Sequence, residues 1–254
     1  MNKDTVRQSL NIVGLVVALV INVLATTLPL GGSTTAQISD SFPILFVPAG
    51  YVFAIWGLIY LGLIAFSIYQ ALPSQRENQR LRKVGLLFFY SSLANAMWLV
   101  FFQYHQFTLA LGMIVILLAL LIAIYLRLEI GRVAVSPAER WLVNMPFSIY
   151  LGWLSVATIA DTTQWLYFIK WNGFGIAPQI WAVTLLVIGV LIASRMSFGR
   201  HDVGYALVLV WAFTGIAVKQ QPVSALVGTA AWFAAAVVVI DLVLSQVLKF
   251  KTKN

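Results

Sequence analysis

Cysteine is absent from the chain, and charged residues are scarce. Without cysteine, the chain cannot form disulfide bonds, use a thiolate nucleophile or ligate a metal through a cysteine sulfur. Charged residues make up 9% of the sequence and hydrophobic residues 61%, with a mean hydropathy of +0.92. A soluble domain carries about 25% charged residues. Water does not tolerate so apolar a surface, so a lipid bilayer is the expected solvent.

Motifs for hydrolysis and phosphoryl transfer are also missing. The sequence contains no Walker loop, nucleophile elbow, HExxH helix or paired catalytic carboxylates, so we predict neither catalytic residues nor a metal site. The net charge of +8 does not indicate nucleic-acid binding, because the basic residues lie in short runs between hydrophobic segments. Such runs set membrane topology and contact anionic headgroups, which makes membrane lipids the expected partners.

What the chain does contain is a series of long hydrophobic segments. The first can cross a hydrocarbon core about 30 Å thick at about 1.5 Å per residue. A cleaved signal peptide is the alternative for that segment, but the run is long for a signal peptide, which favours a retained helix. The sequence therefore predicts an all-α, polytopic membrane helical bundle with about eight transmembrane helices. They are expected at residues 10–30, 50–71, 84–103, 107–128, 141–161, 177–194, 202–218 and 223–248.

The basic residues alternate between successive connections. The two ends of the chain and the connections at residues 76–83, 127–140 and 195–200 hold fourteen of the sixteen Lys and Arg residues. The other connections hold only Lys170 and Lys219. Positively charged loops remain on the cytoplasmic side, so both termini are predicted to be cytoplasmic in a multi-pass protein of the inner cell membrane. The polar loop at residues 31–47 is then outside, where its length makes it a candidate lid.

Aromatic side chains recur at helical spacing in three of the expected spans. The three sets are Phe53, Trp56 and Tyr60; Asn95, Trp98 and Phe102; and Tyr150, Trp153 and Ala157. Their tryptophans fall at similar depth in the outer half of the membrane. Eight of the nine tryptophans, all but Trp141, are expected in that half or in the outer loops. We interpret this as an outward-facing aromatic cavity. An interfacial aromatic belt and ordinary helix packing are the alternatives.

Two polar side chains inside expected spans need partners. The amide of Asn95 must bond either to a neighbouring helix or to a ligand, because an unsatisfied amide is costly in an apolar medium. Asp241 is the one carboxylate clearly within a span. It is either a proton or cation site or a member of a structural hydrogen bond, and the second interpretation is favoured.

These residues resemble the TspO/MBR family of tryptophan-rich sensory proteins, also called translocator proteins or peripheral benzodiazepine receptors. The resemblance covers residues 10–163 and implies a five-helix core at residues 1–163, followed by an additional three-helix segment of the same membrane domain at 164–254. Three motifs carry it: Pro48-Ala-Gly-Tyr-Val-Phe53 followed by Trp56 and Tyr60; Asn95, Trp98 and Phe102; and Tyr150, Trp153, Ser155, Ala157 and Thr158.

The resemblance implies a membrane receptor or sensor for planar hydrophobic ligands, porphyrin, haem or sterol-like, with no obligatory cofactor and a homodimer as a candidate assembly. Family members have been linked to light-dependent porphyrin degradation, so the resemblance leaves enzymatic activity open as a secondary expectation. A transporter of a small amphiphile, with a 4+4 helical repeat, and a membrane assembly factor are the alternatives. The expected ligand-binding residues are Pro48, Gly50, Phe53, Trp56, Tyr60, Asn95, Trp98, Phe102, Tyr150, Trp153 and Ala157.

Overall fold

The computed structural model describes residues 2–28 and 30–251, and within them the regular elements are all helical. Residue 29 of the first expected span, and residues 1 and 252–254 of the expected domains, lie outside the described residues. The elements are α1 (Lys3–Thr27), α2 (Thr35–Asp40), a 3-10 turn (Gly50–Ala54), α3 (Ile55–Ala71), a 3-10 turn (Pro73–Gln75), α4 (Gln79–Val84), α5 (Leu87–Gln103), α6 (Phe107–Arg127), α7 (Pro137–Glu139), a π-helical turn (Arg140–Asn144), α8 (Met145–Phe168), a 3-10 turn (Gly173–Gly175), α9 (Pro178–Arg200), α10 (Val203–Gln220) and α11 (Ala225–Lys251).

The all-α membrane architecture is confirmed. Seven helical segments in the described chain are long and apolar enough to cross a membrane. The eighth expected span is α5, a shorter apolar helix of 17 residues. At the α-helical rise, α5 is about 26 Å long, near the lower limit for a transmembrane helix.

Two compact units make up the chain. Unit 1 comprises the described residues up to 38 together with residues 55–151, and unit 2 comprises residues 39–54 and 152–251. The division passes through α8, so its first turns belong to unit 1 and the rest to unit 2. The boundary after residue 163, which rests on the family resemblance, stays a prediction.

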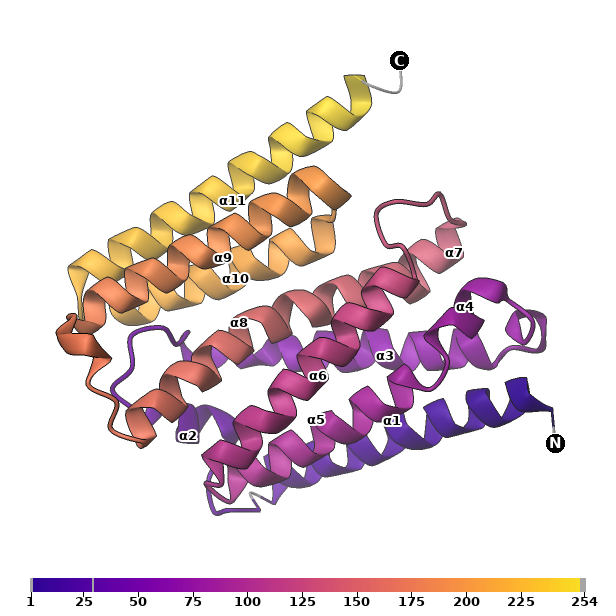
Figure 1. Cartoon of the computed structure of the whole chain (residues 1–254), viewed down its shortest axis with the longest axis horizontal. Helices are drawn as coiled ribbons and strands as arrows, with labels where there is room; N and C mark the ends of the chain where they lie inside the picture. Colours follow the sequence, from indigo (N-terminus) through magenta and orange to yellow (C-terminus); the bar gives the residue numbers. More distant parts are fainter. Residues whose placement is uncertain (1, 29, 252–254) are drawn as a thin grey trace. The chain divides into compact units, whose positions relative to one another are not determined.

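In unit 1, α5 lies between α1 and α6 (Figure 1). Three phenylalanines from different helices meet in its core: Phe66 of α3 packs edge-on against Phe88 of α5 and Phe147 of α8, at 4.9 and 4.8 Å between ring centroids. All three side chains are buried. In lipid, where water provides no drive between apolar helices, van der Waals packing of such buried rings contributes to holding the helices together.

One end of unit 1 gathers the basic segments of its sequence. Arg82 pairs with Asp4 at 2.6 Å, and this carboxylate raises the pKa of Arg82. Arg80 donates to the carbonyl oxygen of Leu128 and to Asn144 Oδ1, both at 2.6 Å, and its burial lowers its pKa. The N-terminal segment and the connections at 76–83 and 127–140 therefore lie together, as the alternation of charge predicts within this unit.

The third expected span begins later than its hydropathy indicates. Gly85, with φ +57° and ψ −129°, ends α4 and separates it from α5. A side chain would be strained in this conformation, which glycine adopts without cost. The apolar run from residue 84 is therefore split, and its first residue, Val84, belongs to a short helix outside the membrane-spanning one.

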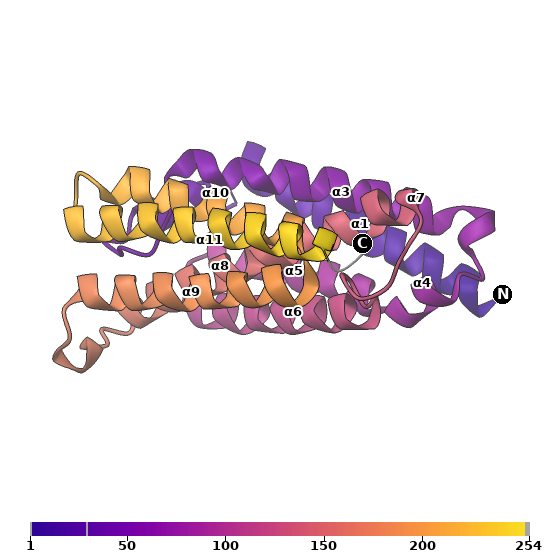
Figure 2. The same ribbon diagram turned by 90° about the horizontal axis from the view of Figure 1, so that it is seen from above.

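In unit 2, α9, α10 and α11 lie side by side (Figures 1 and 2). Pro178 occupies the first turn of α9, where its missing N–H costs nothing. Gly189 of α9 permits close packing, because a Cβ there would lie 2.6 Å from the ring of Phe213 in α10. Asp202 caps the start of α10 by accepting a hydrogen bond from the backbone N–H of Tyr205 at 3.1 Å.

Candidate functional site

The aromatic cluster of unit 1 is built from three helices. Trp56 of α3 stacks on Tyr60 one turn later, with ring centroids 5.5 Å apart and planes at 19°. The same ring stacks on Trp98 of α5 at 5.7 Å and 27°, and meets Tyr150 of α8 edge-on at 6.0 Å. Trp98 continues to Phe102, 5.6 Å away on α5. Six predicted residues, including Asn95, thus form what we call the aromatic cluster: Trp56, Tyr60, Asn95, Trp98, Phe102 and Tyr150.

Asn95 is the polar centre of the aromatic cluster. Its side chain is 1% exposed, and its Oδ1 accepts hydrogen bonds from Asn22 Nδ2 at 3.1 Å and from the Tyr60 hydroxyl at 3.4 Å. Tyr150 also interacts with this amide, but among residues 2–28 and 30–251 no acceptor meets hydrogen-bonding geometry at Asn95 Nδ2. A buried N–H group without an acceptor is uncommon, because its desolvation is uncompensated. The oxygen of the amide therefore joins helices, while its Nδ2 remains available to donate a hydrogen bond.

Sequence reasoning missed Asn22. It lies on α1, and besides Asn95 it donates to the carbonyl oxygen of Ala18 at 2.8 Å. The available signal was an amide within an otherwise apolar span, the same signal that singled out Asn95. Nothing in the sequence pairs the two positions, because they are 73 residues apart.

The rings of the aromatic cluster differ in accessibility. Trp98, Phe102 and Tyr150 are buried, whereas Trp56 and Tyr60 are half-buried. A ligand reaching the cluster would meet Trp56 and Tyr60 first. The cluster offers indole, phenol and amide groups, which suit stacking and hydrogen bonding and provide no imidazole for iron.

The remaining predicted residues lie in unit 2. Phe53 belongs to the 3-10 turn Gly50–Ala54, so the expectation that it shares an α-helical face with Trp56 and Tyr60 is wrong. α3 begins only at Ile55, after this turn has ended. Phe53 instead packs edge-on against Trp153, 5.8 Å away, and Trp153 is buried.

Three other predicted positions also belong to unit 2 and have no aromatic ring. Pro48 is buried, Gly50 starts the 3-10 turn, and Ala157 is half-buried on α8. The binding roles expected of all these residues stay predictions.

The predicted lid is fastened to α10. The backbone N–H of Ala49 donates to the carbonyl oxygen of Gly215 at 3.1 Å. Gln220 Nε2 donates to the carbonyl oxygen of Val47 at 3.3 Å, and Lys219 pairs with Asp40. One face of α10 thus holds the loop at several points.

Part of this polar loop is helical. Residues 35–40 form the short helix α2. Thr34 and Gln37 bond reciprocally at its start, through Thr34 N–H to Gln37 Oε1 at 2.8 Å and Gln37 N–H to Thr34 Oγ1 at 3.3 Å. This is the capping-box arrangement that begins many helices.

Asp241 has a partner within unit 2. Its carboxylate accepts a hydrogen bond from the hydroxyl of Ser194 on α9. The pair links α11 to α9 and gives the favoured structural interpretation of Asp241 a specific contact. An acid bonded in this way is less costly in an apolar layer than a solitary one.

The geometry defines a helical membrane protein with a buried aromatic and amide cluster. The family model described as TSPO-like protein matches residues 8–244. The chain therefore belongs to the TSPO-like family, which confirms the resemblance drawn from the three motifs. The match extends through α9, α10 and most of α11. No curated protein and no solved structure was found to match the chain.

Proposed function

We propose that this protein is an integral membrane receptor that binds a flat hydrophobic ligand, of the porphyrin or sterol class, at the aromatic cluster. Near-parallel rings favour a planar apolar guest, because offset stacking adds about 0.5–1.5 kcal/mol per ring pair beyond area burial. Trp56 and Tyr60, half-buried and 5.5 Å apart, present the accessible part of the stack.

The observation that carries the proposal is the free donor of Asn95. Its Oδ1 is satisfied twice by protein groups, while its buried Nδ2 has no acceptor in hydrogen-bonding geometry within the described part of the chain. If the amide served only to join helices, packing would be expected to satisfy both ends. A carboxylate, a carbonyl or a pyrrole nitrogen of a bound ligand would accept a hydrogen bond from Nδ2. That bond would compensate the desolvation cost of the buried N–H group.

The roles of the cluster residues follow from their contacts. Trp56 and Trp98 supply stacking surface from two helices. Tyr60 and Asn22 hold the Asn95 amide in orientation by occupying its oxygen, at 3.4 and 3.1 Å. The arrangement needs no proton transfer or bond cleavage, which is why we propose a receptor.

The test of this function is to identify the molecule that co-purifies with the protein in mild detergent. We expect an apolar, ring-containing molecule, detected by absorption and mass spectrometry, at near one per chain. Its content should fall in a Trp56→Ala variant and persist in a Trp232→Ala variant, since Trp232 is on α11 and outside the cluster. Recovery of a stoichiometric protein partner without any such molecule would instead support an assembly factor.

A further inference from the structure

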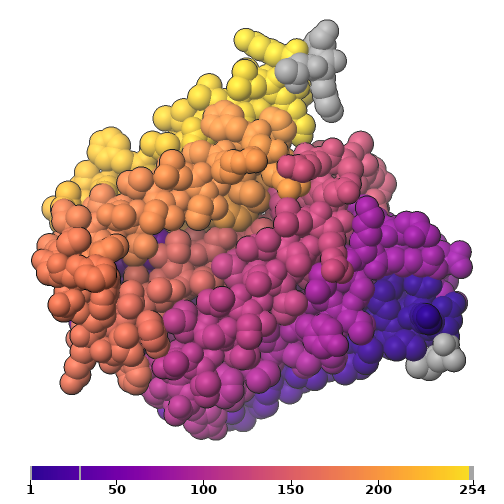
Figure 3. Space-filling view, in the orientation of Figure 1, coloured from indigo at the N-terminus to yellow at the C-terminus, as the bar shows by residue number. Residues whose placement is uncertain are grey.

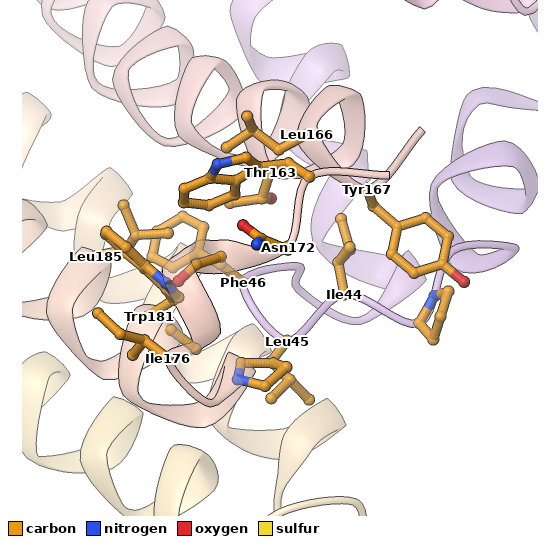
Figure 4. A pocket seen from close by; sticks show the side chains of 15 residues that line it. Ile44, Leu45, Phe46, Thr163, Leu166, Tyr167, Asn172, Ile176, Trp181 and Leu185 are labelled. Carbon is orange, nitrogen blue, oxygen red and sulfur yellow. Dashed lines mark hydrogen bonds between the residues drawn. The ribbon is translucent and has the colours of Figure 1, made fainter. Parts of the chain in front are cut away.

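Unit 2 contains a pocket that the sequence did not indicate. It has a volume of about 280 Å³ and lies between the loop at residues 43–46, the end of α8 and the start of α9. Figure 4 shows Phe46, Leu166, Trp181 and Leu185 around it, with the Asn172 side chain among them. Ligand pockets are typically apolar, with a few placed polar groups, and hold drug-sized molecules at about 300–1,000 Å³. At about 280 Å³, this pocket is slightly smaller than that range.

The wall of the pocket is held in a defined conformation. Trp171 packs against Trp181 with ring centroids 5.3 Å apart, and Trp181 Nε1 donates to the carbonyl oxygen of Gly173 at 3.0 Å. Asn172 Oδ1 accepts from the backbone N–H of Phe174 at 3.1 Å. The turn that joins α8 to α9 is thus braced by side chains before any ligand enters.

The same turn stores backbone strain. Lys170 and Phe174 have φ values of +58° and +56°, a region that residues with a Cβ seldom adopt. The Phe174 side chain is 77% exposed, so burial of this ring does not compensate the strain. The segment lies at the surface of the molecule (Figure 3). Strain of this kind concentrates at ligand clamps and other functional sites.

A cation lies beside the pocket. Lys170 lines an adjoining hollow together with Phe42 and Phe168, and the two spaces share Tyr167 and Trp171 as walls. Lys170 is exposed and forms no ion pair with residues 2–28 or 30–251. An apolar body in the pocket would therefore bring an attached anionic group toward an uncompensated ammonium.

We propose that this pocket is a second binding site, separate from the aromatic cluster, for a free small amphiphile with one or two fused rings and one anionic group. The ring body occupies the space between Phe46 and Trp181. The anion pairs with Lys170 at the rim. The volume of about 280 Å³ limits the ligand to a body much smaller than a tetrapyrrole.

The experiment measures binding of 2-naphthaleneacetate to the full chain in nanodiscs of phosphatidylcholine, by isothermal titration calorimetry against empty nanodiscs. The neutral 2-naphthaleneacetamide serves as the matched probe. We expect saturable binding near one per chain, with the acetate about fivefold tighter than the acetamide, as an exposed ion pair allows.

Three variants locate the site. Lys170→Gln should weaken acetate binding to the level of the acetamide, and the exposed Lys251→Gln, a matched loss of charge on α11, should leave it unchanged. Leu185→Trp should fill the pocket and abolish binding of both probes. If that variant does not fold, the Lys170→Gln result still decides the charge pairing.

Three outcomes would overturn the proposal. The first is heat no greater than that of empty nanodiscs. The second is an acetate-to-acetamide affinity ratio in the Lys170→Gln variant that equals the ratio in the wild type. The third is a phosphatidylglycerol molecule that remains bound in native mass spectra of the wild type, is lost in Leu185→Trp and blocks the acetate, which would assign the site to a lipid.

Discussion

Trp211 of α10 donates a hydrogen bond from its indole Nε1 to the carbonyl oxygen of Val52, at 3.1 Å, across 159 positions of sequence. The ring of Trp211 also meets Tyr51 edge-on, with centroids 5.5 Å apart. One side chain thus holds the 3-10 turn that precedes α3 by both a polar and an aromatic contact. A helix from the C-terminal part of the chain thereby contacts the turn at the start of the motif that begins with Pro48.

Replacing Trp211 by Phe should loosen this turn. The variant keeps a ring against Tyr51 but loses the donor, so the carbonyl of Val52 is left without its partner. We expect a loss of about 0.5–1.5 kcal/mol in unfolding free energy and faster amide hydrogen exchange within residues 46–54. Trp232→Phe, at an exposed position on α11, should change neither quantity. Unchanged exchange in Trp211→Phe would show that the hydrogen bond does not hold the turn.

Gly215 allows the loop to approach α10. A Cβ on this residue would overlap the Val52 side chain and would lie 3.2 Å from Pro48 Cβ. Gly215→Ala should therefore destabilise the protein by about 1–3 kcal/mol through overpacking, measured as a lower Tm. The Gly112→Ala variant is the control, because a Cβ there meets nothing within 4 Å.

The origin of the Gly215 effect can be isolated by a second substitution. Combining Gly215→Ala with Val52→Ala removes the overlapping methyl groups, so the double variant should regain stability relative to the sum of the two single variants. If the stability losses of Gly215→Ala and Val52→Ala simply add in the double variant, the contact between these two positions does not cause the Gly215→Ala effect.

The spans and their order could be predicted from the sequence, because long apolar runs and alternating charge are local signals. The ends could not. The helix that begins at Pro137 runs on to Phe168, beyond Asp161, where polarity suggested a stop. Thr162 bonds back to the carbonyl oxygen of Thr158 at 2.7 Å, which satisfies its hydroxyl inside the helix.

The candidate site was predictable in part, because helical spacing is also a local signal in the sequence. Helical spacing placed Trp98 and Phe102 on one face, and the structure confirms that contact at 5.6 Å. Partners between helices carry no such periodicity, so Asn22 against Asn95 and Trp211 against Val52 could not be predicted. The turn that displaces Phe53 from α3 depends on Val52 and Ala49 bonding to other residues, which is tertiary information.

Asn95 should be important for stability as well as for binding. Asn95→Leu leaves the Tyr60 hydroxyl without its acceptor and removes one of two acceptors from Asn22. We expect a loss of about 1–3 kcal/mol in unfolding free energy, measured by thermal or denaturant unfolding in detergent. Tyr60→Phe loses only the longer of the two bonds and should cost less. A larger loss in Tyr60→Phe than in Asn95→Leu would contradict this account of the amide.

Asp241 provides a test of the transport alternative. Asp241→Asn retains an acceptor for the Ser194 hydroxyl, so a structural role predicts little change in Tm, whereas Asp241→Leu should be clearly less stable. Loss of amphiphile flux in proteoliposomes containing the Asp241→Asn protein, with Tm unchanged, would favour a transporter over a receptor.

The most direct measurement is a titration with protoporphyrin, followed by quenching of tryptophan fluorescence, on wild type and three variants shown to be folded by size-exclusion chromatography. We expect saturable binding that weakens at least about tenfold, or about 1.4 kcal/mol, in Trp56→Ala and in Asn95→Leu. Binding should be unchanged in Trp232→Ala. Equal affinity in all four proteins, or loss of affinity in Trp232→Ala alone, would contradict ligand binding at the aromatic cluster.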